Sequence, residues 1–77
     1  LDPKLRGDRE IVLEAVKNNG LALRYADDTI QSDGKVVLEA IKEFGSAINY
    51  ANKKLTSDQT FIIEAIKLNH DVKEYIT

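Results

Sequence analysis

Hydrophobic residues in the first half of the chain recur with the period of an α-helix. At about 100° per residue, one arc of residues 11–19 carries Ile11, Val12, Leu13, Ala15 and Val16. The arc spans roughly 200°, whereas a surface helix normally shows an apolar stripe little wider than 100°. The pattern therefore predicts a helix that is covered by neighbours on two sides.

The same pattern is written three times. The heptapeptide IVLEAVK at 11–17 returns as VVLEAIK at 36–42 and as FIIEAIK at 61–67. Three units of the chain, 5–29, 30–54 and 55–77, align without gaps at a spacing of 25 residues. Self-similarity at a fixed period of this length is typical of helical repeat proteins. The sequence thus predicts three tandem helical repeats within one domain, 1–77.

Both ends of the repeated helix carry recognisable signals. Asp8, Asp33 and Asp58 precede it at equivalent positions, where a carboxylate accepts hydrogen bonds from free backbone N–H groups. Gly20 and Gly45 follow it, and we expect each to adopt a positive φ as a C′ glycine. His70 holds that place in the third unit, so the turn there is expected to be strained or shaped differently.

Each unit is expected to add a second, shorter helix, at 21–26 and at 46–51. The tyrosines at 25, 50 and 75 share its face with alanines and are predicted to pack in the core. We expect Leu13, Leu38 and Ile63 to fill the space between units. Apolar residues three positions before each Asp cap are expected to plug the turn: Leu5, Ile30 and Leu55. The predicted fold is all-α, with three tandem 25-residue αα-hairpin repeats stacked as a short solenoid or compact helical bundle.

The composition of the chain argues against several classes of function. The 77 residues include no cysteine and one histidine, so disulfides are excluded and no metal site or cofactor is expected. Acidic and basic residues are interleaved with a net charge of −2, which argues against nucleic-acid binding. No apolar run approaches the roughly 20 residues of a membrane span. Because methionine is absent even at position 1, we expect the chain to be a piece of a longer protein.

Residues 8–26, DREIVLEAVKNNGLALRYA, resemble the bacterial tandem repeat family called domain of unknown function 4116. The resemblance covers nearly all of 5–77 and is weakest in the third unit, at Phe61, Ile63 and the His70–Asp71 step. It implies a helical repeat of bacterial proteins, some of them suspected effectors of intracellular pathogens. The protein would then be cytoplasmic or delivered into a host cell. The resemblance implies no activity.

The sequence offers one candidate surface. In stacked repeats, Glu14, Glu39 and Glu64 would form a row beside a row of lysines at the positions Lys17, Lys42 and Lys67. Such a pattern could recognise a complementary peptide, but a solvated face with Glu–Lys pairs at i, i+3 is the interpretation we favour. Phe44 stands where the other units carry asparagine. It is expected to fill a gap in the core, or alternatively to be an exposed anchor for a partner.

A noncatalytic module for protein–protein interaction or scaffolding is the leading functional hypothesis, because solenoids offer extended surfaces. The sequence contains no nucleophile paired with a base, no cluster of metal ligands and no phosphate-binding loop, so it does not indicate an enzyme. The alternative is a structural or regulatory segment of a larger multidomain protein. Asp71 and Lys73 make the third unit a polar cap, so further repeats or a second copy are expected on the face of the first unit.

Overall fold

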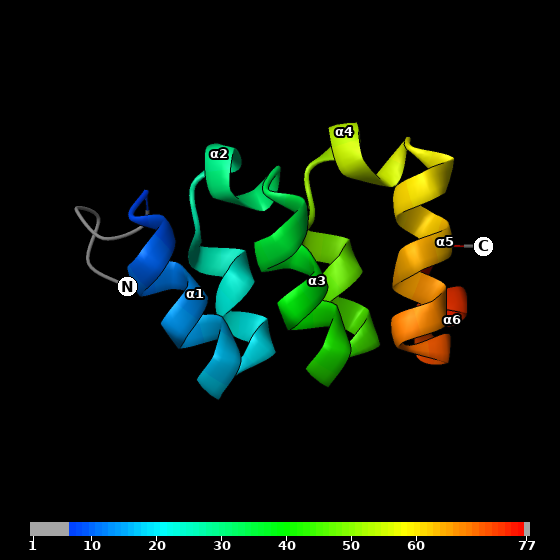
Figure 1. The fold of residues 1–77 in the computed structure, drawn as a ribbon, viewed down its shortest axis with the longest axis horizontal. Coiled ribbons are helices and arrows are strands. Elements are labelled where there is room, and N and C mark those ends of the chain that lie inside the picture. The colour runs from blue at the N-terminus through cyan, green and yellow to red at the C-terminus, as the bar shows by residue number, and fades with distance from the viewer. Residues whose placement is uncertain (1–6, 77) are drawn as a thin grey trace.

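The computed structural model describes residues 7–76, and every regular element in that range is a helix (Figure 1). The prediction of an all-α fold is therefore confirmed. Three ten-residue α-helices alternate with 3₁₀-helices, labelled η, and with one-turn α-helices. In chain order the elements are α1 (Arg9–Asn18), η1 (Gly20–Tyr25), α2 (Asp28–Gln31), α3 (Gly34–Glu43), η2 (Gly45–Tyr50), α4 (Lys53–Thr56), α5 (Gln59–Leu68), η3 (His70–Val72) and α6 (Lys73–Ile76).

The long helices begin at the predicted aspartates. Asp8 Oδ1 accepts from the backbone N–H of Glu10 at 3.1 Å, and Asp33 Oδ1 accepts from that of Lys35 at the same distance. Asp58 Oδ1 accepts from Thr60 N at 2.9 Å. Each cap satisfies a backbone donor that has no partner inside the helix, which is worth about 1 kcal/mol. The N-cap prediction is confirmed for all three helices.

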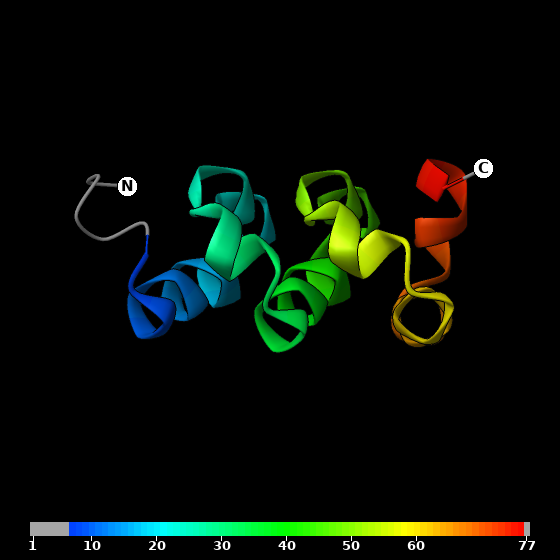
Figure 2. The same ribbon diagram turned by 90° about the horizontal axis from the view of Figure 1, so that it is seen from above.

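The helices form two layers, with α1, α3 and α5 in one and the 3₁₀-helices in the other (Figures 1 and 2). In the first layer α3 lies between α1 and α5, and the described residues extend over 34 × 22 × 16 Å. The core lies between the layers. It comprises Val12, Val16, Leu23, Ile30, Val36, Val37, Ala40, Ile41, Ala47, Ile48, Phe61, Ala65 and Val72.

The wide apolar arc is used most fully by the central helix. Val36, Val37, Ala40 and Ile41 of α3 have no exposed surface, because α3 has a neighbour on each side. In α1, only Val12 and Val16 are buried to that extent. Burial of apolar surface is the main driving force for packing, so α3 is the helix that the fold most depends on.

The glycine prediction was wrong in its mechanism. No residue between 7 and 76 has a positive φ, and the residue before Gly20, Asn19, is extended at φ −154° and ψ 105°. Gly20 instead starts η1 where the backbone of α3 comes close. A Cβ on Gly20 would lie 2.7 Å from Ala40 O, and one on Gly45 would lie 2.9 Å from Asp71 Cβ. We call α1 to α2, α3 to α4 and α5 to α6 the three segments of the fold. Both glycines are required for close packing between neighbouring segments.

His70, at the position equivalent to Gly20 and Gly45, also indicates that these glycines are needed for close packing and not for a positive φ. The residue before it, Asn69, has φ −151° and ψ 108°, nearly the angles of Asn19, so the turn is neither strained nor differently shaped. His70 is exposed, because no described segment packs where α3 packs on Gly20. A side chain is tolerated there for that reason.

The second helices predicted at 21–26 and 46–51 are present as 3₁₀-helices, and two of the three tyrosines, Tyr25 of η1 and Tyr75 of α6, do not pack in the core as predicted. Tyr25 and Tyr75 are 44% and 43% exposed, and only Tyr50 is half-buried against the core. The guanidinium of Arg24 lies over the Tyr25 ring, 4.6 Å from its centroid, and also hydrogen-bonds the Tyr25 hydroxyl. This cation–π contact lies at the surface, so the ring is stabilised without burial.

The residues predicted to fill the space between units do so only in part. Leu13 and Leu38 are half-buried and pack against the core, whereas Ile63 is 53% exposed and does not fill such a space. Ile30 is buried and Leu55 half-buried, as expected of residues beneath the turns, although each lies in a one-turn α-helix rather than a loop. Leu5, the third member of that set, lies outside the described residues.

Candidate interaction surface on the long helices

A shallow groove of about 370 Å³ runs between the two N-terminal long helices, and we call it the α1–α3 groove. Leu13 and Leu38 supply its apolar floor, and charged side chains border it. Its lining residues are Arg9, Leu13 and Lys17 from α1 and Lys35, Leu38 and Glu39 from α3. The groove combines the partly exposed leucines with charged side chains from both helices.

Helical spacing places these residues on the groove. Arg9, Leu13 and Lys17 follow one another at intervals of four, so they form one stripe along α1. Lys35 and Leu38 are three apart on α3, and Lys42 follows four residues later. The helices α1 and α3 run side by side (Figure 1), and the stripe on α1 lines the groove together with Lys35 and Leu38 of α3.

The predicted glutamate and lysine rows are only partly brought together. Lys17 Nζ lies 3.8 Å from Glu14 Oε1, and Lys42 Nζ lies 3.8 Å from Glu39 Oε1, both as i, i+3 pairs. A second hollow of about 280 Å³, next to the groove, is lined by Lys17, Glu39, Lys42 and Glu43. Glu64 and Lys67 are exposed on α5 and form no ion pair with any described residue.

Arg9 links the two walls of the groove. Its Nε donates to Asp33 Oδ2 at 2.5 Å, which joins the start of α1 to the N-cap of α3. Burial raises the pKa of Asp33, but the hydrogen bonds that it accepts from Arg9 and from the backbone N–H groups of Val36 and Lys35 lower it by more, so its pKa lies below the ordinary value of an aspartate. Asp33 is therefore ionised at neutral pH and both caps a helix and pairs with Arg9.

Phe44 is neither fully in the core nor fully free. It is 40% exposed, and its ring lies against Gly20, with Cδ2 3.3 Å from the position that a Cβ of Gly20 would take. Asn19 and Asn69, at the equivalent positions, accept a backbone hydrogen bond at 3.0 Å and cap their 3₁₀-helices. The Phe44 side chain cannot form that hydrogen bond; its ring instead contacts Gly20 across the junction between the first two segments.

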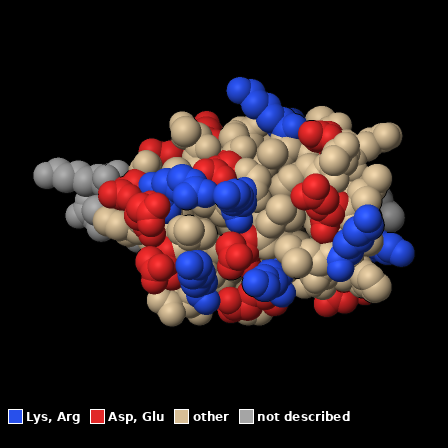
Figure 3. All heavy atoms as spheres, in the orientation of Figure 1, with Lys and Arg blue, Asp and Glu red and all other residues tan. Residues whose placement is uncertain are grey.

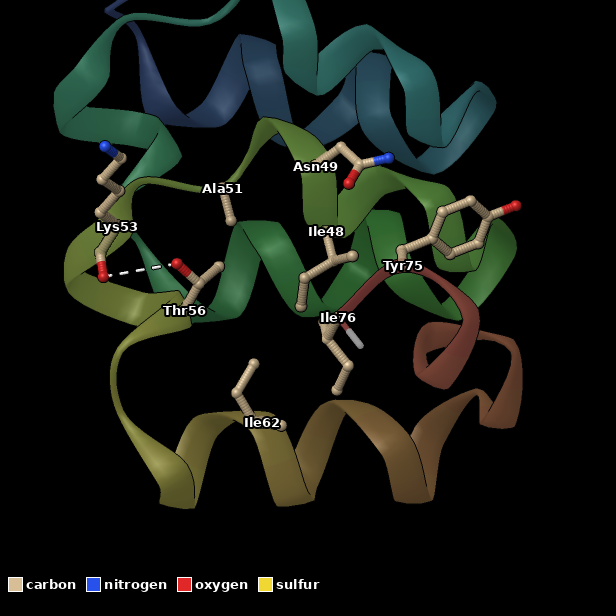
Figure 4. A pocket seen from close by; sticks show the side chains of 8 residues that line it. All are labelled: Ile48, Asn49, Ala51, Lys53, Thr56, Ile62, Tyr75 and Ile76. Carbon is tan, nitrogen blue, oxygen red and sulfur yellow. Dashed lines mark hydrogen bonds between the residues drawn. The ribbon is translucent and has the colours of Figure 1, made fainter.

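A further hollow of about 450 Å³ opens between η2, α4, α5 and α6 (Figure 4). Ile48, Ile62 and Ile76 contribute apolar surface to it, and polar side chains such as Asn49 and Lys53 line the rest. At the equivalent place between the first two segments, Gln31 Nε2 donates to Leu23 O at 3.0 Å and bridges the gap. Thr56 replaces that glutamine, and its hydroxyl donates to Lys53 O instead, which leaves this hollow open.

Between residues 7 and 76, no buried side chain is polar or charged, and no three acidic, histidine or cysteine side chains gather where they could hold a metal ion. Over the same residues, no helix has both the length and the apolar character required to cross a membrane.

Of the residues that line the groove, the sequence pattern marked Lys17 and Glu39 as candidate surface residues, assigned Leu13 and Leu38 to the space between units, and gave no role to Arg9 or Lys35. Leucines at a helical period look like core residues until the position of the neighbouring helices is known. The four-residue spacing of Arg9, Leu13 and Lys17 was the signal that could have found them.

Comparisons with known proteins place the chain in one family. A family model described as "Domain of unknown function (DUF4116)" matches residues 1–31 and 33–76. No curated protein matches the chain, and no solved structure matches it. The family match agrees with the resemblance seen in residues 8–26.

Proposed function

The chain belongs to the family described as "Domain of unknown function (DUF4116)", and we propose that it is a noncatalytic helical-repeat module that binds a protein through the α1–α3 groove. One observation carries the proposal. Leu13 and Leu38 lie in the layer of long helices and are partly exposed, with charged residues on both sides. A partly exposed apolar floor with a polar border is typical of protein-binding surfaces.

The proposal includes three 25-residue repeats stacked as a short solenoid. Its support is the recurring order of a long α-helix, a 3₁₀-helix and a one-turn α-helix, with an aspartate cap at the start of each long helix. Gly20 packs against the next long helix, and Asn69 Nδ2 donates to Ile41 O at 2.9 Å across the next junction. Each repeat then contacts only its neighbours, and the layer of long helices presents a continuous surface.

The absence of catalysis is also part of the proposal. Two carboxyl groups can act as a catalytic acid and base when their environments separate their pKa values. Glu14 and Glu64 are exposed, and Glu39 is half-buried beside Lys42, so none of them lies in an apolar site. The geometry favours recognition over chemistry.

An affinity experiment tests the binding proposal. The 77-residue protein would be immobilised beside a Leu13→Gln, Leu38→Gln variant and incubated with lysate of the organism that encodes it. A Lys53→Gln, Lys54→Gln variant, changed on α4, serves as the matched control, and circular dichroism verifies that all three are folded. We expect at least one protein, identified by mass spectrometry, to be retained by the wild type and the control but lost from the leucine variant. If no protein discriminates between them, the groove is not a binding surface.

The second candidate is a structural or regulatory segment that pairs through the face of the first repeat. One observation favours it: Ile11 and Ala15 of α1 are half-buried, whereas their equivalents in α3, Val36 and Ala40, are fully buried. A preceding repeat or a second copy would cover them. Sedimentation equilibrium tests the second copy: we expect self-association that Ile11→Lys abolishes, and a monomer at all concentrations would contradict it.

A further inference from the structure

We infer that the partner segment of the α1–α3 groove is an acidic amphipathic helix. The inference rests on the proposed function, because it names the class of partner for the same groove. The groove supplies an apolar middle, formed by Leu13 and Leu38, with cations towards both ends. A helix that places two apolar side chains on the leucines and carboxylates on the cations would match it in both respects.

The cations lie in two groups. Lys35 belongs to the first turn of α3, next to Arg9 at the start of α1, whereas Lys17 and Lys42 belong to the last turns of the same helices. The eight steps from position 9 to position 17 rise about 12 Å along the helix. Acidic residues seven or eight positions apart on a partner helix would therefore reach both groups.

These cations differ in whether they already form an ion pair with a carboxylate of the same chain. Arg9 is held by Asp33 at 2.5 Å. Lys35 forms no ion pair with any described residue, and Lys17 has only a 3.8 Å contact with Glu14, whose side chain is 74% exposed. Lys17 and Lys35 are thus the cations available to a new carboxylate, one at each end of the groove.

A helical occupant fits the walls better than an extended one. The two helices that border the groove run side by side (Figure 1), and each contributes one leucine to its apolar floor. Ridges of side chains at i, i+3 and i+4 on a third helix fit between two such helices. An extended strand would leave backbone N–H and C=O groups against leucines that cannot bond them.

Nucleic acid and anionic membranes are poorer matches to the same surface. Acidic side chains are interleaved with the basic ones across this face (Figure 3). Glu39 lies in the groove itself, Glu43 beside it, and the chain carries a net charge of −2. A continuous array of phosphates would meet these carboxylates, whereas a helix with two separated acidic positions avoids them.

Binding of synthetic peptides tests the inference. Three 14-residue helix-favouring peptides share two leucines four residues apart and differ only at two flanking positions, which hold glutamate, glutamine or lysine. They would be titrated into the ¹⁵N-labelled 77-residue protein and followed by amide chemical shifts. We expect the glutamate peptide to shift the amides of Leu13 and Leu38 and to bind at least about tenfold more tightly than the lysine peptide.

Variants connect the preference to the two available lysines. Lys17→Gln with Lys35→Thr, the latter taking the residue found at the equivalent Thr60, should weaken the glutamate peptide at least about fivefold. The control pair Lys53→Gln and Lys54→Gln should change its affinity less than twofold. An unchanged affinity in the Lys17 and Lys35 variant would overturn the inference.

The remaining outcomes separate this inference from the proposed function. Equal or tighter binding of the lysine or glutamine peptide in the groove would overturn the acidic partner but leave the groove as a binding surface. Failure of every peptide to reach the groove would overturn the acidic helix, while the affinity experiment with the leucine variant decides the proposed function independently. Tighter groove binding by phosphatidylserine vesicles or a single-stranded DNA oligonucleotide than by the glutamate peptide would also overturn the inference.

Discussion

Replacing Gly20 by alanine tests how closely neighbouring segments pack. The added Cβ would lie 2.7 Å from Ala40 O and 3.3 Å from Ala40 Cα, both backbone atoms of α3. Contacts as short as the first are essentially unknown for real side chains, so η1 and α3 must separate. The separation would loosen the packing of Leu23 and Val36, two residues with no exposed surface in the core next to this junction.

The cost is expected to be about 1–3 kcal/mol, the usual range for overpacking a well-packed core. A domain of this length has roughly 4–12 kcal/mol of stability, at 0.05–0.15 kcal/mol per residue, so the loss is a large share of the total. With a urea slope of about 1 kcal/mol per molar, the midpoint should fall by about 1–3 M. Urea titration followed by circular dichroism at 222 nm measures it.

Two companion variants make the result specific. In Gly34→Ala the new Cβ would lie 3.7 Å from the Phe61 ring, an ordinary contact, so stability should stay the same or rise by up to about 1 kcal/mol. Gly20→Asn should be at least as damaging as Gly20→Ala, because it adds still more atoms. If Gly20→Ala is within about 0.5 kcal/mol of the wild type, or if asparagine is milder than alanine, close packing does not explain this glycine.

Three further predictions concern burial, pH and capping. Ile41→Ala, at a fully buried site, should cost about 2–5 kcal/mol and the half-buried Leu38→Ala less than half as much, measured by urea denaturation. Because the folded pKa of Asp33 is lowered, its contribution to stability is complete above about pH 4 and is lost as the pH falls through the folded value. Asp33→Asn should therefore flatten the acid limb of the stability–pH profile, and an unchanged slope would contradict the pairing with Arg9. Phe44→Asn gains a cap worth about 1 kcal/mol and loses its contact with Gly20, so the urea midpoint should move by less than about 1 M in either direction.

Local features of the fold could be predicted from the sequence because they depend on few residues. The aspartate caps need only a carboxylate and the N–H groups of the next turn, and all three are formed. The long helices follow from the period of their apolar residues. The family could likewise be identified from residues 8–26, since the match extends over most of the chain.

Features that depend on the neighbours could not be predicted in the same way. Leu13 and Leu38 lie on the same broad arc as Val12 and Val37, and only the position of the adjacent helix decides which of them is buried. The close approach of Ala40 to Gly20 joins residues 20 positions apart, so the sequence suggested a local reason, positive φ, instead. The groove was missed for this reason, because it exists only between two helices.

The central claim is that the three segments stack in chain order, so that the first and third do not touch. Nuclear Overhauser contacts measured on the ¹³C,¹⁵N-labelled protein test it most directly. We predict contacts between Gly20 and Ala40 and between Asn69 and Ile41, with none between α1 and α5, which lie on opposite sides of α3. Contacts between α1 and α5, as a closed three-helix bundle would give, would contradict the stacked arrangement and the groove that depends on it.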